Sequence, residues 1–185
     1  IDFPLPASFI WEMFVRVLPD IPEQSAFNKQ AMSWKLMALL PEMLQHDEFA
    51  MLRHYLNDDT DKRKLFQLAS RTADLYDQYL VYRSDWLIRW EAGELVEGLP
   101  EAQIWQAPLW KALVEHTERL GQPKWHRANL YDRFISILEN ASERPARLPS
   151  RVFICGISAL PPVYLMALNA LGKHIDIHIL FTNPC

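Results

Sequence analysis

The stretch RVFICGISALPPVYLMALNALGKHIDIHILFTNPC, residues 151–185, decides the fold of this chain. It opens with an apolar run, residues 152–157, whose length and β-branched side chains are typical of a buried strand. A second apolar strand is expected over residues 175–181. Strand, helix and strand within about thirty residues predict a parallel βαβ unit with a right-handed crossover. One such unit cannot bury both faces of its sheet, so further strands are expected from elsewhere.

The segment between the two strands has the signals of a helix. Ser158 is expected to cap it, and Pro161 and Pro162 are expected in its first turn, where a missing N–H costs least. Gly172 suits the position after the helix end. Cys155, alone in the first strand, is expected to be a core residue.

The remainder of the chain, residues 1–150, is predicted to be mainly helical. Apolar residues recur there at spacings of three and four, which is typical of helices that bury one face. The expected helices cover residues 8–18, 28–40, 49–56, 61–82, 85–92, 108–120 and 129–140. A polar linker with two prolines, residues 141–150, leads into the βαβ unit. We therefore expect an α/β fold, predominantly helical, with one region at 1–150 and another at 151–185.

Composition limits the classes of function that the chain can have. The chain has 185 residues, half of them hydrophobic and seven of them Trp, so a sizeable core is available. It begins at Ile1 and ends just after an apolar strand, which suggests a piece of a longer protein. Two cysteines and the lack of a membrane-spanning apolar run favour a reduced, cytoplasmic protein. The net charge is −4, so a nucleic-acid role must depend on local sites or on partner subunits.

Motifs for catalysis are missing from the sequence. No G-x-x-x-x-G-K-[ST] loop is present to bind ATP phosphates, and the strand at 152–157 ends without a carboxylate that could hold magnesium. The turn after that strand half-resembles the nucleophile elbow of a serine hydrolase. Leu160 replaces the final glycine, so Ser158 is better interpreted as a helix cap.

Two patterns of acidic or histidine residues have spacings that suit metal ligands. Residues 57–61 match the first calcium-ligand spacings of an EF-hand loop, but the later glycine and glutamate are absent, and Thr60 or Asp61 is expected to cap the next helix. His174, Asp176 and His178 alternate along a strand and could face one metal, but a half-exposed strand explains them equally well.

Several polar and aromatic residues have two interpretations. Trp11 lies off the apolar stripe of its helix, so it is either packed under a neighbouring loop or a platform for a nucleobase. Asp74 and Asp77 either solvate a helix face or accept hydrogen bonds from base amines. Arg83 could be only a helix cap. The cluster at residues 124–127 suits phosphate and base contacts, although loop packing is at least as good an explanation.

Residues 2–185 resemble the N-terminal region of the RecC family, the gamma subunits of exodeoxyribonuclease V. The resemblance covers essentially the whole chain. It is carried by the segments DFPLPASFIWEMFVRVLP, DKRKLFQLA, DLYDQYLVYR, WQAPLWKALVE and WHRANLYDRFI and by the whole segment from residue 151 onward.

The resemblance implies a degenerate superfamily 1 helicase-like fold whose ATP machinery is lost. Residues 1–150 are then a helicase-like layer with its helical insertion, and residues 151–185 return to the α/β core. The implied partners are the RecB and RecD subunits and the 3′-ended single strand of DNA, with no membrane involved. No catalytic site, metal or cofactor is expected in this chain, because the partner subunits use ATP and magnesium.

The resemblance also implies a role in recognising the Chi sequence. The family positions that line the reading site correspond to Leu5, Trp11, Asp74, Leu75, Asp77, Arg83 and Arg127. A structural module that makes only protein–protein contacts within the complex is the alternative function.

Overall fold

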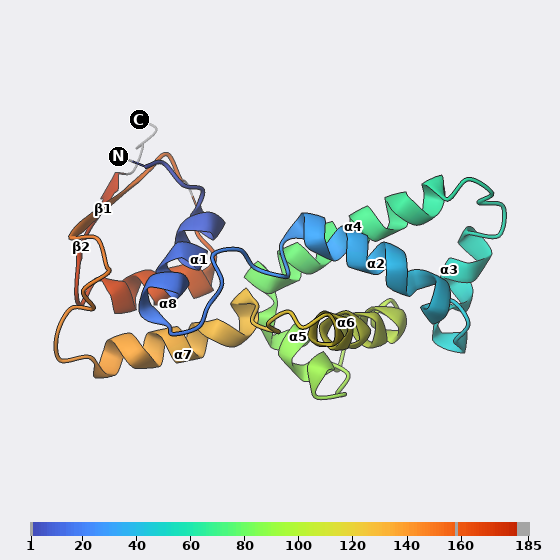
Figure 1. The fold of residues 1–185 in the computed structure, drawn as a ribbon. Helices are drawn as coiled ribbons and strands as arrows, with labels where there is room; N and C mark the ends of the chain where they lie inside the picture. The colour runs from blue at the N-terminus through green and yellow to red at the C-terminus, as the bar shows by residue number, and fades with distance from the viewer. Residues whose placement is uncertain (1, 158, 181–185) are drawn as a thin grey trace. The chain divides into compact units, whose positions relative to one another are not determined.

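The computed structural model describes residues 2–157 and 159–180 (Figure 1). The chain divides into two compact units: unit 1 holds Ile1–Glu23 and Asn129–Cys185, and unit 2 holds Gln24–Ala128. The described residues form eight α-helices, one short 3₁₀ helix and two strands. The prediction of a mainly helical α/β chain is therefore confirmed. The division at residue 150 is expected from the family resemblance and not from compactness. It stays a prediction.

Unit 1 contains the βαβ motif. Its two strands pair in parallel, with Arg151 opposite Asp176 and Cys155 opposite Leu180. The parallel unit expected from the sequence is therefore confirmed. The elements of unit 1 are α1 (Pro6–Val17), α7 (Arg127–Asn140, of which the first two residues belong to unit 2), β1 (Arg151–Cys155), α8 (Pro162–Leu171) and β2 (Asp176–Leu180).

Aromatic side chains hold the three helices of unit 1 together. The ring of Phe14 on α1 meets Tyr131 and Phe134 of α7 edge to face, with centroids 5.3 and 5.0 Å apart. Tyr164 of α8 lies 6.5 Å from Tyr131 between ring centroids. Figure 1 shows these helices next to one another, beside the two strands. The hydrophobic core of unit 1 thus lies among helices.

The strands of unit 1 are less buried than the sequence suggests. No residue of β1 is buried, and Cys155 is exposed, so the prediction of a core cysteine is wrong. The reason is that two strands alone present two faces and two edges, and three helices cannot cover them all. Helix α8 begins at Pro162 with Pro161 as its N-cap, so Pro161 is not in the first turn; Ser158, the expected cap, lies outside the described residues.

Unit 2 is a bundle of helices. Helices α2 and α4 run antiparallel, because Ser33 Oγ lies 3.2 Å from Ser70 Oγ and the ring of Trp34 lies near that of Phe66. The elements are α2 (Lys29–Met43), the 3₁₀ helix η1 (Asp47–Phe49), α3 (Ala50–Tyr55), α4 (Arg63–Tyr82), α5 (Ser84–Glu91) and α6 (Gln103–Arg119). Their core includes the buried residues Leu36, Leu40, Tyr76, Trp90, Trp110 and Leu113.

Several predicted helix starts are wrong. Helix α6 begins at Gln103, so Pro108 lies inside it rather than in its first turn. Helix α7 begins at Arg127, so Asn129 lies within its first turn and does not cap it. Helix α4 has Lys62 as its N-cap, with φ of +60°, in place of Thr60 or Asp61.

The acidic segment before α4 does have a structural purpose. The carboxylate of Asp59 accepts hydrogen bonds from the backbone N–H groups of Lys64 and Leu65, at 3.1 and 2.8 Å. Amides in the first turn of a helix have no partner within the helix, so a carboxylate there is stabilising. The segment that superficially resembles a calcium loop therefore holds the start of α4.

Candidate nucleic-acid interface

Five of the seven candidate residues belong to unit 2 and lie on or beside α4. Asp74, Leu75 and Asp77 are half-buried residues on the C-terminal half of this helix, and Arg83 directly follows its last residue. Arg127 is the first residue of α7. The two aspartates are three residues apart, which places them on one side of the helix about one turn from each other.

The structure brings Asp77 and Arg127 into direct contact. Arg127 Nη2 donates a hydrogen bond to Asp77 Oδ1, and the two side chains form an ion pair. The Arg127 side chain is only 11% exposed, whereas that of Asp77 is 38% exposed. A largely desolvated guanidinium needs an opposite charge nearby, so Asp77 stabilises Arg127. The carboxylate of Asp77 also remains accessible to solvent. Two candidates fifty residues apart thus form one group.

Asp74 has a partner that the sequence analysis missed. Lys29, the first residue of α2, forms an ion pair with the Asp74 carboxylate. Lys29 is 62% exposed at its side chain and Asp74 is 32% exposed. Such a pair is weak and easily exchanged for another donor. The signal for it is the antiparallel alignment of α2 with α4, which no local sequence pattern reveals.

Arg83 occupies a one-residue junction between two helices. Its backbone N–H donates to Tyr79 O at 2.9 Å, as the end of α4 requires, and its carbonyl accepts from Trp86 N at 3.0 Å. The side chain is fixed as well: Nε and Nη2 donate to the two carboxylate oxygens of Asp85 at 3.2 and 3.0 Å. The guanidinium carbon lies 3.8 Å from the ring centroid of Trp86. The interpretation of Arg83 as only a cap thus omits two side-chain contacts.

The remaining candidates, Leu5 and Trp11, belong to unit 1. Trp11 is only 8% exposed, and its indole Nε1 donates to the carbonyls of Pro22 and Glu23, both at 3.1 Å. It is therefore packed under the loop that follows α1, as one of the two interpretations predicts. Its use as a base-stacking platform stays a prediction. Leu5 is exposed and is the N-cap residue of α1.

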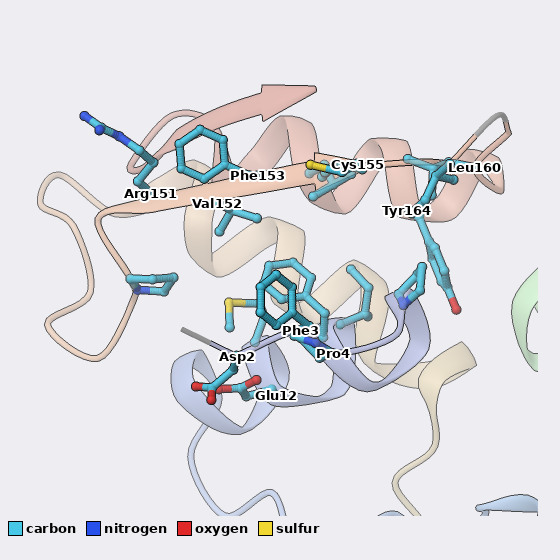
Figure 2. A pocket seen from close by; sticks show the side chains of 18 of the residues that line it. Asp2, Phe3, Pro4, Glu12, Arg151, Val152, Phe153, Cys155, Leu160 and Tyr164 are labelled. Atoms are coloured by element: carbon cyan, nitrogen blue, oxygen red, sulfur yellow. The ribbon is translucent and has the colours of Figure 1, made fainter. Parts of the chain in front are cut away.

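A cavity of about 780 Å³ lies in unit 1 between the segment before α1 and strand β1. Figure 2 shows Phe3 and Pro4 on one side of it and Val152 of β1 on the other. Its lining is mainly apolar. Leu5 lies between Pro4 and Pro6, which both line the cavity, but does not line it itself.

Residues of the basic cluster at 124–127 have different contacts in the structure. His126 is completely buried, and its Nε2 lies 2.7 Å from Glu91 Oε1. The same carboxylate oxygen accepts from Trp110 Nε1 at 2.9 Å. His126 therefore serves loop packing, while Arg127 reaches the face of α4.

Neither a metal centre nor a membrane segment is found in the described part of the chain. No group of three or more His, Cys, Asp or Glu side chains within residues 2–157 and 159–180 could hold a metal ion. His174 Nε2 instead lies 2.7 Å from the carbonyl oxygen of Leu138. Among these same residues, no helix combines the length and apolar character needed to cross a bilayer.

Comparison with known proteins gives consistent matches over the whole chain. The family described as "RecC, N-terminal domain" matches residues 1–185. The chain is 76% identical over 185 residues to the RecBCD enzyme subunit RecC of Escherichia coli K12, covering 100% of the chain and 16% of that protein. It is 41% identical over 205 residues to the Haemophilus influenzae subunit of the same name, covering 100% of the chain and 18% of that protein. The Mycobacterium tuberculosis subunit is 30% identical over 192 residues, with 100% and 16% covered. The chain thus spans less than a fifth of the length of these relatives.

Proposed function

Because this chain belongs to the RecC N-terminal domain family, we propose that it is a non-catalytic, DNA-contacting region of a RecBCD-type helicase-nuclease. Its role would lie in cytoplasmic double-strand-break repair by recombination. There it contributes to guiding the 3′-ended single strand and to recognising Chi. Its partners are the RecB and RecD subunits, which use ATP and magnesium, so this chain needs no cofactor of its own.

The observation that carries the proposal is a group of charged side chains on α4 and directly beside it. Asp74 and Asp77 lie on one side of the helix, where Arg127 pairs with Asp77, and Arg83 follows the last residue of the helix. Carboxylates accept from the exocyclic amines of bases, and guanidinium groups donate to base acceptors. Each of these groups has an ion partner in this structure, so a nucleic acid would exchange one charged contact for another rather than meet bare charges.

A site made of a few charged side chains is also consistent with the net charge of the chain. The chain has a net charge of −4, so it lacks the general positive charge that draws DNA without regard to sequence. A few base-reading side chains supply selectivity rather than strong binding. Bulk affinity is then expected to come from other parts of the assembly.

The test is Chi-dependent cutting by enzyme rebuilt with the altered subunit, measured on a panel of single-base Chi variants. Asp74→Asn and Asp77→Asn each keep one acceptor oxygen and add a donor, so the preference profile should shift at particular bases by about 1–3 kcal/mol. Unwinding and bulk degradation should persist. Glu94→Gln is a matched control, because Glu94 is an exposed carboxylate that pairs with Arg89 at 3.3 Å outside the candidate set.

The second candidate function is a structural module that makes only protein–protein contacts. The exposed apolar side chains of the sheet, among them Phe153 and Leu180, favour it. An unchanged preference profile in both aspartate variants, with normal assembly of the complex, would leave this function as the better one.

A further inference from the structure

The one-residue junction between α4 and α5 fixes a charged side chain in a way that the candidate set does not explain. Arg83 has a non-helical backbone, with φ of −139° and ψ of 47°, and separates two helices that both bury residues in the core of unit 2. Its backbone groups are bonded on both sides, to Tyr79 O and from Trp86 N. The origin of the side chain therefore has little freedom to move.

Two neighbours then hold the guanidinium itself. The Asp85 carboxylate accepts from Nε and Nη2 through its two oxygens, which is the fork-to-fork geometry in which arginine and carboxylate bind most strongly. Trp86 supplies a flat face 3.8 Å below the guanidinium carbon, where the ring attracts a cation. Hydrogen bonding from Arg83 also lowers the pKa of the Asp85 carboxyl below its ordinary value, so this partner stays ionised at neutral pH.

The Trp86 ring is itself packed against other aromatic rings. The Trp86 ring meets Tyr79 edge to face at 5.2 Å and lies 6.3 Å from Trp90, which is buried. Asp85 stands in the first turn of α5, where the helix dipole favours a negative charge. Asp85 and Trp86 have few rotatable side-chain bonds, so both hold the guanidinium of Arg83 from well-defined positions.

Within the described part of the chain, the guanidinium of Arg83 donates hydrogen bonds only to Asp85, which leaves a defined part of it for a ligand. Arginine has five N–H donors, and Asp85 engages two of them, on Nε and Nη2. The outer edge, formed by Nη1 and the second hydrogen of Nη2, points away from that carboxylate. Two donors side by side match the paired acceptors on the edge of a guanine. A side chain already held in place loses little conformational entropy when it binds.

We propose that Asp85 and Trp86 are positioning residues that preorganise Arg83 to donate to the acceptor edge of a base. The inference rests on the proposed function, since it needs Arg83 to contact nucleic acid. It adds two residues and a mechanism: the salt bridge and the ring set the direction of the guanidinium, and so determine which base is preferred.

The test is a double-substitution cycle in the rebuilt complex, with the Chi-variant panel as readout. Arg83→Ala should change the preference at particular bases, and Asp85→Ala should weaken preference at the same bases by roughly fivefold. Adding Asp85→Ala to Arg83→Ala should cause no further loss, because Asp85 acts only through Arg83. Trp86→Leu should resemble Asp85→Ala, whereas Trp86→Phe, which keeps a flat ring, should restore most of the preference.

The control is the Arg89–Glu94 pair at the other end of α5, with the nitrogen and oxygen 3.3 Å apart. Glu94→Ala removes an exposed partner of an arginine on the same helix and should leave the profile unchanged. The melting temperature of each altered chain shows whether Trp86→Leu has merely loosened the aromatic cluster; Asp85→Ala, on an exposed side chain, keeps the inference testable in that case.

The possible results distinguish failure of the positioning role from failure of the proposed DNA contact of Arg83. If Arg83→Ala changes the profile but Asp85→Ala and Trp86→Leu do not, or if their effects add to it, the positioning role is overturned and the proposed function stands. If Arg83→Ala itself leaves the profile unchanged, its proposed DNA contact fails, and the positioning role fails with it. A uniform weakening on all Chi variants would show a phosphate contact in place of a base contact and would also overturn the inference.

Discussion

Unit 2 has large aromatic side chains that are completely buried in its core, whereas the sheet of unit 1 leaves apolar side chains in solvent. Trp90 and Trp110 are 1% and 0% exposed, but Phe153 on β1 is 59% exposed. The difference follows from the elements themselves. Each helix satisfies most of its own backbone hydrogen bonds, so the six helical segments of unit 2 can pack their buried side chains into one core. A two-stranded sheet has two faces and two open edges, which is marginally stable unless other elements cover it.

The closed core of unit 2 is the first place to test this comparison. Trp110→Ala should destabilise the chain by about 3–5 kcal/mol, because it removes a completely buried ring together with its contacts to Phe27, Tyr76 and His126. It also removes the hydrogen bond to Glu91. Urea denaturation followed by far-ultraviolet circular dichroism measures the effect. A loss below about 1.5 kcal/mol would mean that the core of unit 2 is looser than described.

A buried lysine gives the second test within unit 2. Lys35 is 7% exposed, and its ammonium donates to Ala26 O at 2.8 Å and to Thr117 Oγ1 at 3.0 Å. Burial lowers its pKa from 10.5 to about 8. Between these values the unfolded chain binds more protons than the folded chain, so the free energy of unfolding rises with pH.

The expected gain is about 2 kcal/mol between roughly pH 7.5 and 9.5, by linkage between the two pKa values. This range ends below about pH 10, the midpoint at which tyrosines of the unfolded chain ionise. Lys35→Met should abolish the rise, because the titrating group is gone. A flat stability profile for the unaltered chain would contradict the burial of this ammonium.

The two ion pairs of α4 should differ in strength. Asp77→Ala leaves Arg127, which is 11% exposed, without its carboxylate and should cost about 1–2 kcal/mol. Asp74→Ala breaks a pair with an exposed lysine and should cost less than about 0.5 kcal/mol. Denaturation midpoints of the two variants give the comparison. Equal costs would show that burial of Arg127 does not matter to stability.

The sequence predicts the elements of both units better than it predicts their surroundings. The parallel βαβ unit, the long helix near residues 61–82 and the linker at 141–150 can all be recognised from local patterns. Helix starts are harder, because the residue that satisfies the first turn can lie outside it. Asp59, three residues before the N-cap Lys62, binds the first-turn amides of α4.

The candidate site is likewise only partly predictable from local sequence patterns. Its members come from the family resemblance, and the sequence places Asp74, Leu75 and Asp77 on one helix without further help. The partners of its charged groups are mostly distant in sequence: Lys29 meets Asp74 only because α2 runs antiparallel to α4, and Arg127 reaches Asp77 across fifty residues. Asp85 and Trp86 are local, but their contacts depend on the helix break at Arg83.

The smallest effect is expected on the open sheet of unit 1, which makes it the sharpest test of the comparison. Phe153→Ser should change the free energy of unfolding by no more than about 0.5 kcal/mol, because most of this ring is already in solvent. Its stacking on His178, with centroids 4.8 Å apart, is a contact between two accessible rings. Phe14→Ser in the same unit is the matched control, because Phe14 is 0% exposed and should cost several times more. A large loss from Phe153→Ser would show that this face is covered in solution, and a dependence of that loss on protein concentration would identify a second copy of the chain as the cover.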